Sequence, residues 1–267
     1  MNIAFFGREF GQILREKLEK AGFSIVNPES HKVDLIVVGF YGKILPKKVL
    51  EIPRYGALNV HPSLLPKYRG PTPVQTTILN GETETGVTII LMDEKMDHGP
   101  IVARESFKIG DKRFTTPELT KELWELGGDL LVKIIPQWIA GSITSVPQDH
   151  AKATYTKLLK KEDGRIDWNK PAQEIERQIR AFTPWPGTFS LFGERSLKIL
   201  KASVLPESVA KLPPRVAFLT EDKKLAIQCG EDALVIEELQ LEGKKPMSAK
   251  DFLLGHKDIL GSKLNFV

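Results

Sequence analysis

Two polar residues close a short apolar run in the first quarter of the chain. Asn59 and His61 end the run over residues 56–61, which has turn-forming residues on both sides and is typical of a strand buried in a parallel sheet. Residues two apart on a strand share one face, so the amide and the imidazole lie on the same side. Ligands of open α/β sheets bind at the carboxyl ends of the strands. Pro62 and Pro66 stiffen the loop that follows, and the pattern predicts a polar reaction centre.

Asp97 is the third candidate for this centre. If the strand predicted at residues 86–92 neighbours the strand ending at His61, the loop that carries Asp97 can lie over the imidazole. A carboxylate favours the protonated imidazole and orients it for proton transfer. Asn59 could donate a hydrogen bond to an oxyanion that develops at a carbonyl carbon. Spacing alone leaves another interpretation open, in which His61 is structural, Asn59 forms a turn and Asp97 caps a loop.

Other chemistries find less support in the sequence. The five histidines include no i, i+4 pair and there is one cysteine, so we expect no metal site. Ser63 lacks the G-x-S-x-G surroundings of a nucleophile and is better suited to contacting a ligand. Gly7 and Gly11 lack the third glycine and the ribose-binding acid of a dinucleotide fingerprint. Lys67 and Arg69 could bind an anionic substrate tail or be solvated loop charges.

Length and composition indicate an ordinary globular chain. Its 267 residues, with 41% hydrophobic and 27% charged residues, are enough for two modest domains. No stretch approaches the roughly 18 apolar residues of a membrane span. The single cysteine, Cys229, fits a reducing compartment, so we expect a cytoplasmic protein. Charges balance over residues 1–150, and the whole excess of +4 falls in residues 151–267, a hint of a polyanionic partner there.

The order of predicted elements indicates an α/β domain followed by a β domain. Strands are predicted at residues 1–6, 23–26, 34–39, 56–61, 86–92 and 101–107, with helices at 11–21, 46–50, 73–79 and 117–139. This alternation indicates a doubly wound sheet. Residues 27–33 are too short for a helical crossover, which needs at least about 10–12 residues, so the sheet is abbreviated there.

The second half of the chain has a different pattern. Residues 144–162 are polar and are predicted to be a linker. A helix at residues 171–181 and five short alternating segments then predict a small β-barrel. We therefore predict a first domain at residues 1–143 and a second at residues 163–267.

Several motifs resemble one known family. Residues 59–70, with the sequence NVHPSLLPKYRG, are similar to the signature of the folate-dependent formyltransferases. Residues 84–88 and 92–100 continue the resemblance, and so do later segments at 165–168, 174–187 and 242–253. Within the family, the chain is most similar to the members that formylate initiator Met-tRNA.

The resemblance implies a fold, a reaction and a site. It implies a Rossmann-like formyltransferase domain joined to an OB-like barrel that binds tRNA. It also implies a role in translation initiation: formyl transfer from the co-substrate 10-formyltetrahydrofolate to the methionine α-amino group of initiator Met-tRNA. We expect the enzyme to be a monomer and, from the residue spacing described above, to use no metal. The catalytic residues would be Asn59, His61 and Asp97. The folate site would be formed by two loops: Ser63, Leu64, Leu65 and Pro66 in one, and Gly39, Phe40, Tyr41, Gly42, Ile44 and Leu45 in the other.

One departure from the family pattern concerns the acceptor. The tRNA-specific members carry a longer segment, with a helix and a basic loop that meets the acceptor arm, where this chain has only residues 27–33. A nucleotide-linked amino sugar is therefore an alternative acceptor. A further alternative, a tRNA- or folate-binding protein without catalysis, would not require Asn59, His61 and Asp97 together.

Overall fold

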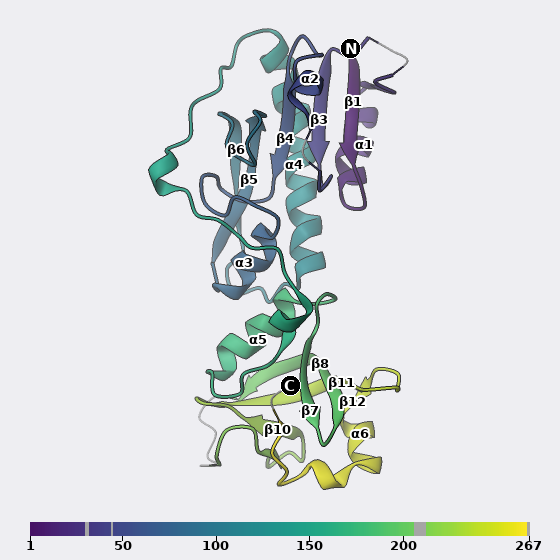
Figure 1. Ribbon diagram of the computed structural model, residues 1–267, viewed down its shortest axis with the longest axis vertical. Coiled ribbons are helices and arrows are strands. Elements are labelled where there is room, and N and C mark those ends of the chain that lie inside the picture. Colours follow the sequence, from purple (N-terminus) through teal and green to yellow (C-terminus); the bar gives the residue numbers. More distant parts are fainter. Residues whose placement is uncertain (30–31, 44, 206–211, 266–267) are drawn as a thin grey trace. The chain divides into compact units, whose positions relative to one another are not determined.

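The computed structural model describes residues 1–29, 32–43, 45–205 and 212–265 (Figure 1). Its contacts separate two compact units. The first comprises Met1–Thr77, Glu82–Lys112 and Glu118–Leu158, and the second comprises Ile78–Gly81, Arg113–Pro117 and Leu159–Val267. Within the described ranges, no helix is both long enough and apolar enough to cross a membrane.

The first unit is built on a six-stranded sheet. Its strands lie in the order β2-β1-β3-β4-β5-β6. They are β1 (Asn2–Gly7), β2 (Ser24–Val26), β3 (Leu35–Gly39), β4 (Ala57–His61), β5 (Glu84–Leu91) and β6 (Ile101–Lys108). The strands from β2 to β4 are parallel, whereas β5 and β6 each run antiparallel to their neighbours. Only residues 92–100 join β5 to β6, too few for the helical crossover that a parallel pair needs. The predicted Rossmann-like sheet is confirmed, and it is mixed.

Helices cover both faces of this sheet. The helices on its faces are α1 (Gly11–Lys20), α2 (Lys47–Leu50) and α4 (Thr116–Ile139), the last lying behind the strands in Figure 1, and α3 (Pro73–Leu79) follows the loop after β4. Helices α1 and α4 pack so closely on one face that a Cβ on Gly39 would lie 2.4 Å from Cδ1 of Leu14 and 2.9 Å from Cζ3 of Trp124. The other face carries an apolar cluster that includes Ala57 and Leu50. Glycine at position 39 permits this close helix–sheet packing.

The alternation along β4 explains why its polar residues emerge together. Leu58 and Val60 face α4, because a Cβ on Gly127 of that helix would lie 2.7 Å from Val60. Ala57, Asn59 and His61 therefore share the opposite face. Ala57 belongs to the apolar cluster there. The strand thus begins in the core and presents its polar residues where it ends.

The second unit is a curled antiparallel sheet with two helices. Its strand order is β7-β8-β11-β10-β9, with β12 paired to β11. The elements are α5 (Ala172–Ala181), β7 (Thr188–Phe192), β8 (Arg195–Leu205), β9 (Ala217–Leu219), β10 (Leu225–Gln228), β11 (Ala233–Leu241), β12 (Met247–Ser248) and α6 (Ala249–Gly255), with short 3₁₀ turns at Lys161–Gly164 and Lys257–Ile259. Irregular pairing between Ile236 and Leu239 of β11 bends the sheet around a core that contains Trp168 and Phe252. This half-barrel confirms the predicted β architecture.

Much of the predicted linker, up to Leu158, belongs to the first unit. The backbone of Arg69 accepts from Thr156 at 2.7 Å and donates to Thr154 at 2.9 Å. Arg69 and Tyr155 thereby form a parallel β-bridge. A 3₁₀ turn at His150–Lys152 precedes this bridge. Residues 148–156 are consequently held beside the loop that follows β4, while the predicted domain and linker boundaries remain predictions.

Candidate active site

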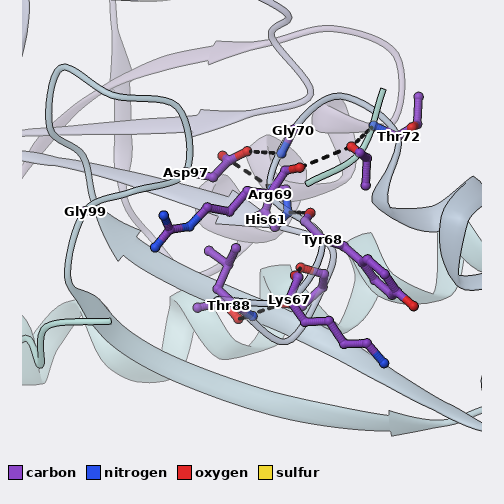
Figure 2. A network of polar contacts seen from close by, with 12 residues as sticks. His61, Lys67, Tyr68, Arg69, Gly70, Thr72, Thr88, Asp97 and Gly99 are labelled. Atoms are coloured by element: carbon purple, nitrogen blue, oxygen red, sulfur yellow. Dashed lines mark hydrogen bonds and ion pairs between the residues drawn. The ribbon is translucent and has the colours of Figure 1, made fainter. Parts of the chain in front are cut away.

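His61 lies at the carboxyl end of β4 with both ring nitrogens engaged (Figure 2). Its side chain is nearly buried. Nε2 lies 2.9 Å from the carbonyl oxygen of Tyr68, and Nδ1 lies 3.4 Å from Oδ1 of Asp97. A carbonyl oxygen can only accept a hydrogen bond, so Nε2 carries the donated hydrogen. Nδ1 is therefore the nitrogen that can gain or lose a proton during a reaction.

Asp97 reaches His61 because its loop folds back over the sheet. Strand β5 runs antiparallel to β4, so its last residue, Leu91, lies opposite Leu58 and not opposite His61. The following loop returns along the strand, and Asp97 adopts a left-handed backbone conformation with φ of 49°. The amide of Gly70 donates to Oδ2 of Asp97 at 2.8 Å, which leaves Oδ1 to face the imidazole (Figure 2). Structure thus brings two of the three predicted residues into contact.

Asn59 lies two residues before His61 on β4 and therefore shares its face. Its side chain is half-buried. Within the described part of the chain, no residue forms a hydrogen bond with its amide. An amide that is partly exposed and unpaired beside a histidine can donate to a ligand atom.

The loop after His61 is tied to the neighbouring strands. The hydroxyl of Thr88, which lies opposite His61 on β5, donates to the carbonyl of Ser63 at 2.7 Å and accepts from the amide of Leu65 at 3.0 Å. Arg104 of β6 donates to the carbonyl of Leu65 at 3.0 Å. Sequence reasoning assigned no role to Thr88 or Arg104, because only the strand register places them beside the loop.

The predicted folate-loop residues differ in accessibility. Ser63 is buried, and its hydroxyl donates to the carbonyl of Lys67 at 2.6 Å. Leu65 is also buried, whereas Leu64 and Pro66 are half-buried. Ligand contacts from this loop would therefore come mainly from Leu64, Pro66 and backbone atoms.

The second predicted folate segment follows β3 at the same edge of the sheet. Gly39 and Leu45 are buried, whereas Phe40 is 43% exposed. The ring of Phe40 packs edge-on against Phe10 and Trp124. Of the remaining members, Tyr41 is half-buried against Phe6, Gly42 is exposed, and Ile44 lies outside the described residues.

Lys67 and Arg69 are engaged within the protein. Lys67 pairs with Glu82 at 2.6 Å and lies over the ring of Tyr68, whose hydroxyl also donates to Glu82. The hydrogen bond to Glu82 raises the pKa of Lys67. A cavity of about 290 Å³ lies beside these side chains and is also lined by Leu64. Arg69 is buried and cannot meet a substrate tail, whereas the side chain of Lys67 remains 49% exposed within its ion pair.

Across the described ranges, no three histidine, cysteine, aspartate or glutamate side chains are grouped so that they could hold a metal ion. The chemistry that this arrangement offers is proton transfer at Nδ1 of His61, next to an amide donor. Such a pair suits reactions in which an oxyanion forms while a nucleophile loses its proton.

Two family models match the chain. Residues 15–135 match the formyl transferase domain, and residues 158–257 match the formyl transferase C-terminal domain. These matches and the fold define a formyltransferase with both characteristic domains. The chain belongs to the methionyl-tRNA formyltransferase family, as its similarity to individual relatives shows.

The relatives cover most of the chain. Methionyl-tRNA formyltransferase of Chloroflexus aurantiacus is 48% identical over 223 residues, which are 83% of this chain and 72% of the relative. The protein of the same name from Roseiflexus sp. is 44% identical over 95% of this chain and 76% of its own length. Among solved structures, HypX of Aquifex aeolicus in complex with tetrahydrofolic acid has a similar fold, with a TM-score of 0.74 at 21% identity, over 95% of this chain and 47% of HypX.

Proposed function

We propose that this protein transfers the formyl group of 10-formyltetrahydrofolate to the α-amino group of methionine on initiator Met-tRNA. The single observation that carries the proposal is the position of His61, which is held between Asp97 and the carbonyl of Tyr68 and lies next to Asn59. It occurs in a chain that is 48% identical to a methionyl-tRNA formyltransferase. We further propose that it acts in the cytoplasm, as a monomer and without a metal ion.

The proposed mechanism uses His61 as a proton relay. The neutral amine of the methionyl group attacks the formyl carbon, and a C–N bond forms as the formyl oxygen becomes negative. Asn59 donates a hydrogen bond to this oxyanion, an interaction worth about 10²–10³ in rate in comparable sites. Nδ1 of His61 accepts the proton that the amine loses. The same proton then passes to the folate nitrogen as the bond between that nitrogen and the formyl carbon breaks.

Asp97 stabilises the charged form of His61 in this mechanism. When Nδ1 is protonated, the imidazolium faces Oδ1 of Asp97 at 3.4 Å. Gly70 holds the other carboxylate oxygen, so the carboxylate need not reorient when the proton arrives. Such pre-arranged groups stabilise a charge without reorganisation at the moment of reaction.

The folate site is proposed at the sheet edge where β3 and β4 end. Leu64 and Pro66 would supply half-buried apolar contacts, and Phe40 an exposed ring. Thr88 and Arg104 support this proposal because they restrain the backbone of the loop between Ser63 and Leu65.

The identity of the formyl acceptor rests on fewer observations than the reaction does. The C-terminal part carries the whole positive excess of the chain, which suits the phosphates of tRNA, and we propose that the half-barrel binds them. Residues 27–33 are shorter than the segment that the resemblance implies for tRNA recognition, so selectivity for the initiator needs a direct test.

The test compares acceptors under one condition. Purified protein with 10-formyltetrahydrofolate is given charged initiator Met-tRNA, charged elongator Met-tRNA and a nucleotide-linked amino sugar in parallel. We expect formylmethionine on the initiator, with affinity falling steeply as salt rises. Transfer to the sugar alone, or to none of the three, would overturn the proposed function. A flat salt response would remove the half-barrel from tRNA binding.

A further inference from the structure

Gln148 uses its whole side-chain amide within the first unit. The side chain is 5% exposed. Its Nε2 donates to the carbonyl of Asp97 at 2.9 Å and to the carbonyl of Gly99 at 2.7 Å. Its Oε1 accepts from Nε and Nη2 of Arg69 at 3.2 and 2.6 Å. An amide has two hydrogens and two lone pairs to offer, so these four bonds fix its orientation.

Arg69 lies between the two backbone groups that hold the proposed catalytic pair. The residue before it, Tyr68, supplies the carbonyl that accepts from His61. The residue after it, Gly70, supplies the amide that donates to Asp97. Figure 2 shows the Arg69 side chain extending toward the segment of Gly99, away from these two contacts. Any shift of Arg69 would therefore move the supports of both partners.

The guanidinium of Arg69 is buried with neutral partners. Besides Gln148, it donates to Nδ1 of His150 at 2.9 Å and lies at the edge of hydrogen-bond distance, 3.5 Å, from the hydroxyl of Tyr155. In the part of the chain that the structure describes, it forms no ion pair with a carboxylate. A buried cation without a counter-ion is costly, so the orientation of Arg69 depends on the hydrogen bonds that Gln148 and His150 accept from it.

The position of Asp97 also depends on its backbone conformation. A left-handed conformation, with φ of 49°, is uncommon for a residue with a side chain, although aspartate adopts it more readily than most. Gln148 holds the carbonyl of Asp97 itself and that of Gly99, two residues on. The contacts thus close a ring that runs from His61 through Tyr68, Arg69 and Gln148 to Asp97 and back to His61.

We infer that Gln148 and Arg69 are positioning residues that hold the Asp97 carboxylate against His61 for formyl transfer. The inference rests on the proposed function for its kinetic consequence, and on the ring of contacts for its geometry. Residues 148–156 therefore complete the catalytic site. Neither Gln148 nor Arg69 touches the reacting atoms in this assignment.

The most direct test is the substitution Gln148→Glu, which nearly preserves the shape of the side chain. The carboxylate keeps both acceptor positions for Arg69 but turns an oxygen toward the carbonyls of Asp97 and Gly99, which lose their donor. We expect kcat to fall by about 10–100-fold with KM values changed less than about twofold, since small displacements near reacting groups have effects of this size. Gln148→Met removes all four bonds and should do the same. Gln137→Met, on the exposed side of α4, is the matched control and should leave kcat unchanged.

A double-mutant cycle separates positioning from a general structural role. If Gln148 acts through Asp97, Gln148→Glu should lower kcat by less than about twofold in an Asp97→Asn background, because coupled residues are not additive. A full multiplicative loss in that background would overturn the inference, and so would unchanged kcat in the single variant.

A spectroscopic measurement decides the geometry without relying on turnover. In protein labelled with ¹⁵N-histidine, the Nδ1 resonance of His61, assigned by its loss in His61→Gln, should move in the same direction in Gln148→Glu as in Asp97→Asn. An unmoved resonance would overturn the ring of contacts even if the wild-type protein is active. If the wild-type protein transfers no formyl group but the resonance moves, the proposed function fails and the positioning role stands.

Discussion

Nδ1 of His61 faces Oδ1 of Asp97 at 3.4 Å, and each of the two side chains is also held by a backbone group. The second ring nitrogen, Nε2, donates to the carbonyl of Tyr68, and the second carboxylate oxygen, Oδ2, accepts from the amide of Gly70. Both groups are therefore held from behind by the chain between Tyr68 and Gly70. Nδ1 and Oδ1 face each other, so a proton that Nδ1 takes up is met by the charge of the carboxylate.

Replacing His61 should remove the relay and leave the fold intact. His61→Gln can still donate to the carbonyl of Tyr68 but has no group that accepts a proton at neutral pH. We expect the formylation rate to fall by about 10²–10⁴, the usual contribution of a positioned acid or base. Single-turnover assays measure the rate, and a melting temperature close to that of the wild type provides the folding control. A rate within tenfold of the wild type would contradict the assigned role.

Thr88→Val should disturb the loop after β4. The substitution preserves shape but leaves the carbonyl of Ser63 and the amide of Leu65 without their partner. We expect a loss of about 1–3 kcal/mol in unfolding free energy, the cost of unsatisfied buried groups, and a raised KM for the folate. Thr77→Val is the matched control. The hydroxyl of Thr77 is buried and has no partner within the described chain, so its removal should not destabilise the protein. Equal losses from the two variants would argue against a specific role for Thr88.

Glu176 should be essential to the second unit. Its carboxylate is almost fully buried and pairs with Arg180 at 2.6 Å and with Arg113 at 2.8 Å. Glu176→Leu would remove the carboxylate partner of Arg180, which is largely buried, and of Arg113, which is 51% exposed. Removal of one member of a buried ion pair costs about 3–5 kcal/mol, and the exposure of Arg113 places the expected loss at the lower end of that range. Urea unfolding measures the change. Glu174 lies on the same helix as Glu176 but forms an exposed ion pair, with Lys170. Glu174→Leu should therefore change the free energy of unfolding by less than about 1 kcal/mol.

Cys229 should be unreactive in the folded protein. Burial raises the pKa of its thiol to about 12, so almost no thiolate is present at pH 8. Iodoacetamide should label it only after urea unfolding, as mass spectrometry can show. Rapid labelling of the native protein would show that the thiol is accessible.

Acid should weaken the contacts around Arg69. Partial desolvation, together with the charges of neighbouring His98 and Arg69, lowers the pKa of His150 below the ordinary value of 6.5. Between the folded and unfolded pKa values the unfolded chain binds more protons, so stability is present above pH 6.5 and is lost as the pH falls below it. The melting temperature should therefore drop more between pH 7.5 and 5.5 in the wild type than in His150→Gln. An identical drop would exclude His150 as a contributor.

The predicted elements of the catalytic unit were largely correct because local patterns determine them. Apolar runs bounded by glycine and proline identified the strands that become β1, β3 and β4, and the two-residue spacing of Asn59 and His61 placed them on one face. The condition on which the assignment of Asp97 depended, that the strand before it neighbours β4, is met. Its antiparallel direction was not foreseen, since a strand's own residues do not encode the direction of its neighbour.

The sequence by itself determined the types of group at the site and the family to which they belong. Only the tertiary structure decided which atoms of those groups are free. Tyr68 and Gly70 occupy one end of His61 and of Asp97, Thr88 restrains the loop, and Gln148 joins Arg69 to Asp97 from 51 residues along the chain. These contacts depend on strand register, on a left-handed residue and on the docking of a segment that resembles a linker. Such long-range relationships arise from packing, which no local spacing in the chain specifies.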